Sequence, residues 1–282
     1  MRDVQQALKE FTEAFQSHGV DHPKRQAEEL LEDLLHLSRI QLYTHFEQPL
    51  QETEWLTCQA WLKRRLNGEP LAHITGQISF YNCLIQVTPQ GLIPRQETEI
   101  LVDHIAKILQ HQDLSGMKLW DLCCGTGCIG IALKKKFADL TVTLSDISAE
   151  ALALAQANAE CNQVDVRCLQ GDLLAPFKGE KAHFIVCNPP YVSEEEYQQL
   201  ETSVKLFEPR LALVGGLTGL EFYRRLADEM PYYLESAAKI WLEVGYQQGE
   251  EVKKIFENQP WTHQQLFNDW AGHHRFFFLE NE

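Results

Sequence analysis

The chain has 282 residues, of which 44% are hydrophobic and 23% charged, and its formal net charge is -15. A surface this acidic repels phosphate backbones, and no run is long and apolar enough for a membrane span, so we expect a cytoplasmic, monomeric protein without direct nucleic-acid or membrane contact. The eight cysteines form no Cys-x-x-Cys pair, which disfavours a zinc site and leads us to expect no metal.

The first 72 residues predict a small all-α bundle. Apolar residues recur at helical spacing in several short segments, as Val4 and Leu8 do in the first. Residues that favour helix starts or ends separate these segments, namely Gly19, Pro23, Ser38 and Gly68. We interpret residues 1–72 as a separate helical domain.

The pattern changes from about Ile74. Two short runs rich in β-branched and aromatic residues flank Asn82, which predicts a β-hairpin. We interpret residues 73–94 as a hairpin linker between two domains.

In residues 95–282, strand-like and helix-like segments alternate. The predicted strands are 118–122, 141–146, 165–170, 183–188, 239–244, 262–267 and 275–280. The predicted helices are 98–111, 128–137, 148–161, 217–229 and 246–257. This alternation is typical of βαβ units, so we expect an α/β domain with helices on both faces of a mainly parallel seven-stranded sheet. The last two strands lack a helix between them and predict an antiparallel edge pair.

A glycine-rich turn, residues 121–130, lies where the first strand of this domain leads into a helix. Gly125 and Gly127 permit positive φ and close approach of a ligand, and the helix that follows directs amide N–H groups at it. Asp146 ends the second strand at the spacing of a ribose-binding carboxylate. Asp172 follows the third strand, where a carboxylate can accept from an adenine amino group. The pattern predicts a nucleoside-containing ligand at this edge of the sheet.

The glycine spacing alone also matches the dinucleotide fingerprint. A diphosphate is repelled by a neighbouring anion, whereas Asp121, just before the glycines, favours a cationic sulfonium or ammonium group. A nicotinamide oxidoreductase and a non-enzymatic binding protein are the alternatives from other functional classes.

Asn188-Pro189-Pro190-Tyr191 follows the fourth strand. Prolines have no backbone N–H, so the segment presents carbonyl acceptors and almost no donors. The Asn188 side-chain oxygen and the Pro189 carbonyl are each able to accept one hydrogen of an NH₂ group, and Tyr191 offers a flat face to a planar amide. Proline after Asn188 restricts that residue to extended conformations. We expect catalysis by orientation of a planar amide or amine nitrogen.

These motifs resemble the protein-(glutamine-N5) methyltransferases that modify peptide chain release factors, the PrmC/HemK family. The similarity runs from Gly68 to the C-terminus. It rests on the blocks GEPLAHITG (68–76), IPRQETEILV (93–102), NPPYV (188–192), FEPRLALVGG (207–216), GLEFYRRL (219–226) and EVGYQQGEEV (243–252). The resemblance implies a class I, Rossmann-like methyltransferase that uses S-adenosylmethionine. Its protein substrate would be a class I release factor, methylated on the glutamine of a Gly-Gly-Gln loop, with the helical domain helping to dock it.

The resemblance and the motifs together assign site residues. The cofactor-binding set is Asp121, Cys123, Cys124, Gly125, Thr126, Gly127, Asp146, Asp172, Leu173 and Asn188. The substrate-binding set is Asn188, Pro189, Pro190 and Tyr191, with Asn188, Pro189 and Tyr191 as catalytic residues. Cys123 departs from the family because many relatives carry glycine there, and a positive φ would strain it.

Two questions stay open in the sequence. Arg95, Glu97 and Glu99 are assigned either to the methionine end of the cofactor and its lid or to a structural salt bridge. The NPPY element is shared with adenine-N6 DNA methyltransferases and does not exclude a ribosomal-protein glutamine as substrate. A DNA target would need a recognition region rich in Lys and Arg, and we interpret the basic run Lys63–Arg65 as a solvated helix face, so a DNA target is disfavoured.

Overall fold

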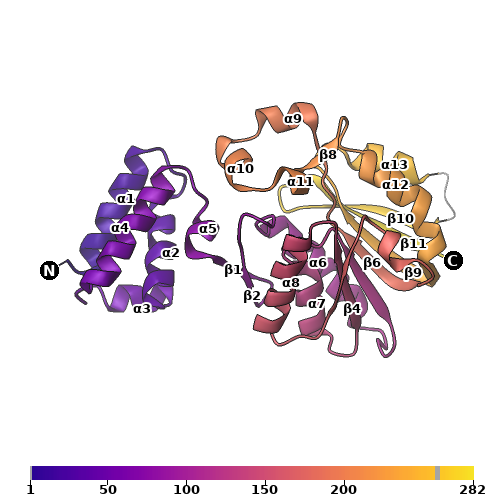
Figure 1. Cartoon of the computed structure of the whole chain (residues 1–282), viewed down its shortest axis with the longest axis horizontal. Helices are drawn as coiled ribbons and strands as arrows, with labels where there is room; N and C mark the ends of the chain where they lie inside the picture. Colours follow the sequence, from indigo (N-terminus) through magenta and orange to yellow (C-terminus); the bar gives the residue numbers. More distant parts are fainter. Residues whose placement is uncertain (1, 258–260) are drawn as a thin grey trace. The chain divides into compact units, whose positions relative to one another are not determined.

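The computed structural model describes residues 2–257 and 261–282. The chain forms two compact units, Met1–Gln77 and Ile78–Glu282. The first is helical and the second is built on a large sheet (Figure 1). No helix of the described ranges is long and apolar enough to cross a membrane.

The first unit contains the helices α1 (Val4–Ser17), α2 (Pro23–Leu35), α3 (Arg39–Thr44), α4 (Glu52–Leu66) and α5 (Leu71–Thr75). Their apolar stripes meet in a core that includes the fully buried Phe11 and Phe15. Ser38 caps α3 as predicted, because its hydroxyl accepts from the Gln41 amide in a capping box. The sequence did not predict α5, which extends the helical region beyond Ile74.

The second unit has a seven-stranded sheet of order β10-β11-β9-β6-β3-β4-β5. Its strands are β3 (Lys118–Leu122), β4 (Thr141–Asp146), β5 (Arg167–Gln170), β6 (Ala182–Cys187), β9 (Leu234–Glu243), β10 (Trp261–Asn268) and β11 (His274–Asn281). The pairs from β5 to β9 are parallel, and β11 is antiparallel to both β9 and β10. The predicted mainly parallel sheet with an antiparallel edge pair is confirmed.

The order of the strands reverses between β3 and β6. From β3 the chain proceeds outward to β4 and β5, and it then returns to place β6 on the other side of β3. In open α/β sheets the carboxyl ends of the strands on either side of such a reversal form the crevice in which ligands bind. The glycine-rich turn follows β3, and the Asn188–Tyr191 segment follows β6.

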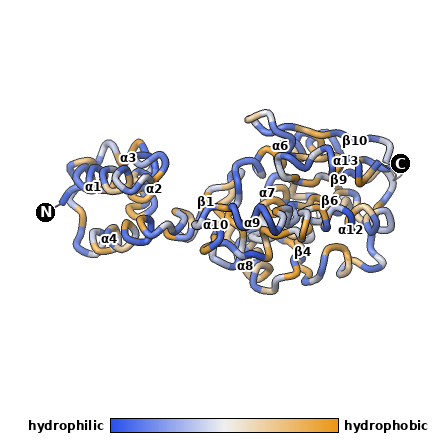
Figure 2. Tube along the Cα trace, turned by 90° about the horizontal axis from the view of Figure 1, so that it is seen from above, coloured by the Kyte–Doolittle hydropathy of each residue, from blue (hydrophilic) through white to orange (hydrophobic). Residues whose placement is uncertain are grey.

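Helices cover both faces of the sheet (Figure 1). They are α6 (Gln96–Leu109), α7 (Cys128–Lys136) and α8 (Ala149–Cys161) on one side and α12 (Glu221–Glu229) and α13 (Gly249–Phe256) on the other, with the 3₁₀ turns η1 (Ala175–Phe177) and η2 (Met230–Tyr233). Trp120 stacks on Phe177 in the core beneath α12 and α13. Figure 2 shows the hydrophobic residues concentrated inside this unit around β4 and β6.

Two predicted helices begin later than expected. The predicted helix 217–229 starts only at Glu221, because Gly219 has a positive φ of 74° that a helix cannot include. The predicted helix 246–257 starts at Gly249, because residues 245–248 form a turn closed by the Gln248 amide donating to the Gly245 carbonyl at 2.8 Å.

The segment between β6 and α12 has short elements that the sequence did not predict. They are β7 (Val192–Ser193), α9 (Glu194–Gln199), α10 (Thr202–Phe207), α11 (Arg210–Leu213) and β8 (Val214–Gly216). Strands β7 and β8 pair in parallel, so the segment returns to the place where it left the sheet.

The hairpin predicted around Asn82 is present as β1 (Gln77–Phe80) and β2 (Cys83–Gln86). Tyr81 and Asn82 both have positive φ, as a two-residue hairpin turn requires. Two asparagine side chains hold β2, those of Asn158 in α8 and of Asn162, the C-cap of that helix. The amide of Asn158 bonds the N–H and C=O of Gln86 at 2.7 and 3.0 Å, and Asn162 bonds those of Leu84 at 3.2 and 2.7 Å.

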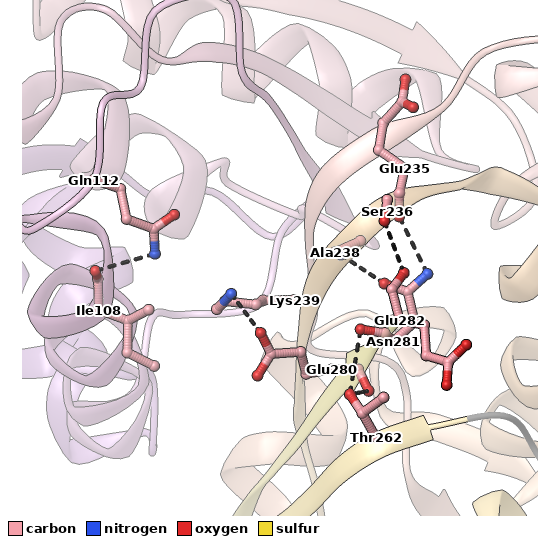
Figure 3. Close-up of polar contacts among 10 residues, drawn as sticks. All are labelled: Ile108, Gln112, Glu235, Ser236, Ala238, Lys239, Thr262, Glu280, Asn281 and Glu282. Carbon is pink, nitrogen blue, oxygen red and sulfur yellow. Dashed lines mark hydrogen bonds and ion pairs between the residues drawn. The ribbon is translucent and has the colours of Figure 1, made fainter.

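The final residues of the chain are fastened to the beginning of β9 (Figure 3). The Asn281 side chain accepts from the Ala238 amide at 2.6 Å and donates to the Glu235 carbonyl at 3.1 Å. Lys239 and Glu280 form an ion pair at 2.7 Å between β9 and β11. These contacts fix β11 in register, so its other end reaches the carboxyl edge of the parallel strands.

Candidate active site

A cavity lies at the carboxyl edge of the parallel strands, on both sides of the reversal in strand order. Its wall comprises Gln90, Gly91, Leu92, Pro94, Arg95, Thr98, Cys123, Cys124, Gly125, Thr126, Cys128, Ile129, Asp146, Ile147, Ser148, Ala151, Gly171, Asp172, Leu173, Asn188, Pro190, Pro209, Leu211, Ala212 and Phe222. Most of the site residues predicted from the sequence are therefore together on one surface. Asp121, Gly127, Pro189 and Tyr191 are not part of the wall.

The glycine-rich turn is held by Asp146 at the end of β4. One carboxylate oxygen of Asp146 accepts from the Gly125 amide at 2.9 Å, and the other accepts from the Ser148 amide at 2.9 Å. Gly125 and Gly127 have φ values of +53° and +78°. A Cβ on Gly127 would lie 3.0–3.1 Å from Ile131, Leu144 and Ala155. Both glycines are thus required by the backbone of the turn.

Cys123 is the first residue of this turn after β3 and has a φ of +54°, in the left-handed region. This is the condition under which the sequence predicted strain, because a side chain with a Cβ is disfavoured there. The residue nevertheless lines the cavity.

Asp121 lies in β3, at the start of the glycine-rich turn, and is buried. One carboxylate oxygen accepts from the Gly130 amide at 2.8 Å. The other oxygen is also buried and has no hydrogen-bond partner among the described residues. Burial, together with the nearby Asp146 charge, raises the pKa of Asp121 to about 7, and the Gly130 amide opposes this shift.

Asp172 and Leu173 follow β5 at the other end of the cavity. Both oxygens of Asp172 accept from Arg225 of α12, at 3.1 and 2.8 Å. Leu173 is buried and has a positive φ of 48°, which turns the chain so that it contributes to the wall. Arg225 therefore sets the orientation of the carboxylate that the sequence assigned to an adenine amino group.

The Asn188–Tyr191 segment contributes Asn188 and Pro190 to the wall. The Asn188 side chain has no hydrogen bond within the described parts of the chain, so both its oxygen and its NH₂ group are available to a ligand. Pro189 is buried behind the wall, and Tyr191 is half-buried.

Gly215, Gly219 and Gln248 hold the last two residues of this segment, Pro190 and Tyr191. A Cβ on Gly215 would lie 2.3 Å from the Pro190 carbonyl oxygen, and one on Gly219 would lie 2.2 Å from that of Tyr191. The Gln248 side chain donates to the Tyr191 carbonyl at 2.8 Å and accepts from the Gly245 amide at 3.2 Å. The segment is thus fixed by close backbone packing and by one side-chain amide.

The block that contains Arg95 forms another part of the wall. Arg95 pairs with the buried Glu208 at 2.6 Å, and Glu208 also accepts from the Ile93 amide at 3.2 Å. Of the two roles that the sequence left open, the ion pair is present, and Arg95 lines the cavity as well. Glu97 and Glu99 do not line it.

Sequence reasoning missed several residues of the site. Thr98 and Gly91 line the cavity, and a Cβ on Gly91 would lie 3.0 Å from Thr126. Asn158 is buried in α8 and donates to the Thr126 carbonyl at 3.0 Å, so it supports the glycine-rich turn. One signal for it was available: Asn158 lies within an alanine-rich helix, where asparagine is unfavourable without a partner.

Comparisons with family models and with named relatives agree on one family. A family model described as "PrmC N-terminal domain" matches residues 6–76, and one described as "Methyltransferase small domain" matches residues 95–211. The release factor glutamine methyltransferase of Chlamydia trachomatis is 43% identical over 99% of this chain and 94% of its own length. That of Bacillus cereus is 33% identical over 99% of both chains. A methyltransferase structure from Pyrococcus furiosus shares the fold, with a TM-score of 0.52 at 18% identity over 72% of this chain and 92% of its own.

The backbone of Cys123 gives a first prediction. Replacing Cys123 by glycine or by alanine removes the same thiol, but only alanine keeps a Cβ in the left-handed conformation. We expect the glycine variant to be more stable than the alanine variant by about 1 kcal/mol in chemical denaturation. At Cys124, whose φ is not positive, the order should reverse. If the glycine and alanine variants ranked in the same order of stability at both positions, the backbone strain at Cys123 would be contradicted.

The raised pKa of Asp121 gives a second prediction. Because its pKa is about 7 when folded and about 4 when unfolded, the folded state retains the proton between these pH values. The contribution of Asp121 to the free energy of unfolding is therefore full below about pH 4 and is lost as the pH rises to about 7. The free energy of unfolding of the parent protein, relative to Asp121→Asn, should fall by up to about 1.4 kcal/mol per pH unit in this window. Parallel stability curves for the two proteins would refute this.

Proposed function

The chain belongs to the family of release factor glutamine methyltransferases, and we propose that it transfers a methyl group from S-adenosylmethionine to the side-chain amide nitrogen of the glutamine in the Gly-Gly-Gln loop of class I release factors. The observation that carries the proposal is the placement of Asn188, with a side chain free of partners in the described structure, beside the glycine-rich turn in one cavity. The protein would act in the cytoplasm, as a monomer, with the helical unit helping to dock the release factor.

The residues of the cavity fit the proposed cofactor. Gly91 and Gly125 have no side chain and line the cavity, so a ligand can approach their backbone closely. Asp146 and Asp172 each offer carboxylate lone pairs beyond those already used, for ribose hydroxyls and for an adenine amino group. Asp121 lies one layer deeper, so its influence on a cationic sulfonium would be electrostatic.

S-adenosylmethionine supplies an electrophilic methyl group on its sulfonium. The role of the chain is to aim the lone pair of an amide nitrogen at that methyl group. The Asn188 side-chain oxygen and the Pro189 carbonyl each accept one hydrogen of the substrate NH₂, while the Tyr191 ring packs against the amide plane. As the N–C bond forms and the C–S bond breaks, the nitrogen becomes cationic, and it loses its proton afterwards. No strong base is needed, so orientation is the main contribution.

Labelled methyl transfer to a purified release factor tests the proposal. The control is the same factor with the Gly-Gly-Gln glutamine changed to alanine, which should take up no label. A ribosomal protein and an adenine-containing DNA duplex are the rival acceptors. Label on either of these, or equal label on the glutamine and alanine factors, would overturn the proposed substrate.

Asn188 gives a third prediction. We expect Asn188→Ala to lower kcat by about 10²-fold or more, because the amide loses one of its two acceptors and its orientation. Its affinity for S-adenosylmethionine, measured by calorimetry, should stay near that of the parent. Unchanged turnover would refute the mechanism, and a loss confined to cofactor affinity would reassign the residue.

Asp146 gives a fourth prediction. Asp146→Ala removes the acceptor for ribose and both backbone bonds to Gly125 and Ser148. We expect the dissociation constant for S-adenosylmethionine to rise by a factor that corresponds to about 1.5–3 kcal/mol. Asp139→Ala is the matched control, because Asp139 is exposed just before the amino end of the same strand. Equal affinities in all three proteins would contradict the ribose assignment.

A further inference from the structure

A group of buried polar side chains contacts Tyr191, and none of them was among the site residues predicted from the sequence. Arg275 of β11 donates to the Tyr191 hydroxyl oxygen at 3.2 Å and lies 3.5 Å from a carboxylate oxygen of Glu243, the last residue of β9. The side chain of Glu243 is fully buried, and that of Arg275 is 11% exposed. A buried charge persists in a protein only when it is paired, so these two groups support each other.

Glu243 is held from two further sides. The Thr98 hydroxyl donates to its second carboxylate oxygen at 2.7 Å, and the Tyr223 hydroxyl donates to its backbone carbonyl at 2.8 Å. Burial raises the pKa of the Glu243 carboxyl, and Arg275 opposes that shift. Since Thr98 lines the cavity, the group connects the cavity wall, through Glu243, to the Tyr191 ring.

Arg275 is itself fixed in place. Its backbone carbonyl accepts from the Val244 amide at 2.8 Å, just beyond the register in which β11 pairs with β9. Its guanidinium carbon lies 5.5 Å from the centre of the Tyr191 ring, within the range of a cation–π contact. Arg275 therefore contacts the aromatic side chain at both its hydroxyl and its ring.

The backbone of Tyr191 is held by Gly219 and Gln248, and its side chain packs against the core beneath α12 and α13. Apolar packing is not directional, whereas the hydrogen bond from Arg275 fixes where the hydroxyl lies and therefore the plane of the ring. We propose that Arg275 is a positioning residue, which fixes the plane of the Tyr191 ring against which the substrate amide packs. The inference rests on the proposed function, because it assigns Tyr191 to the substrate.

A double-mutant cycle tests this role. The variants are Tyr191→Phe, which keeps the ring and removes the hydroxyl, and Arg275→Met, made together with Glu243→Gln so that no buried carboxylate is left unpaired. Glu243→Gln alone is the reference for the second variant, and Arg275→Lys tests rescue by a cation. Arg167→Met, which breaks an exposed ion pair with Glu180, is the matched surface control.

We expect Tyr191→Phe and Arg275→Met each to lower kcat about tenfold, with less than a twofold change in KM for S-adenosylmethionine. The combined variant should also lose about tenfold rather than about a hundredfold, because both changes remove one contact. Arg275→Lys should recover part of the loss. A hundredfold loss of kcat in the combined variant, or a fall in thermal stability with kcat unchanged, would overturn the proposal.

A second readout does not depend on methyl transfer. The ¹³Cζ resonance of Tyr191 in tyrosine-labelled protein, assigned by its loss in Tyr191→Phe, should shift when Arg275 is changed to Met in the Glu243→Gln protein and should not shift in Arg167→Met. A resonance unmoved by the loss of Arg275 would overturn the proposal even if the enzyme is active. If the resonance shifts but the parent protein does not methylate a release factor, the contact stands and the proposed function fails.

Discussion

The lack of a backbone N–H at Pro189 and Pro190, in the middle of the Asn188–Tyr191 segment, is the constraint on which the site depends. Two consecutive prolines cannot continue a strand ladder, so no neighbouring strand can hold this stretch in the usual way. The chain instead brings Gly215 and Gly219 against the two carbonyls that follow, and Gln248 donates to the second of them. The sequence blocks that contain Gly215, Gly219 and Gln248 lie far from this segment in the sequence, and their role is to hold it in place.

Charge is distributed in the second unit so that carboxylates near the cavity have defined partners. Asp146 is held by backbone amides, Asp172 by Arg225, and Glu208 by Arg95. Asp121 is the exception, since one of its oxygens is buried without a partner in the described structure. Carboxylates held in this way present fixed lone pairs to a ligand and need little rearrangement when it binds, which is the electrostatic form of preorganisation.

The sequence was sufficient to predict those parts of the fold that depend on local residue patterns. The bounds of β3 and β4 were predicted to the residue, because β3 is a short apolar run that leads into the glycine-rich turn and β4 is a β-branched and apolar run that ends at Asp146. It was not sufficient for α9, α10 and α11, which are too short and polar to show a period. The pairing of Asp172 with Arg225 was also beyond it, since these residues lie 53 positions apart and only the folded sheet brings them together.

Asn158 of α8 and Asn162 at its C-cap have a consequence for association between chains. A strand whose outer edge exposes unpaired N–H and C=O groups is a template on which another polypeptide can add. On β2, the outward groups of Leu84 and Gln86 are already occupied by the Asn162 and Asn158 amides, which imitate a neighbouring strand. A helix thus closes an edge that would otherwise be open to aggregation, and it does so without adding a strand.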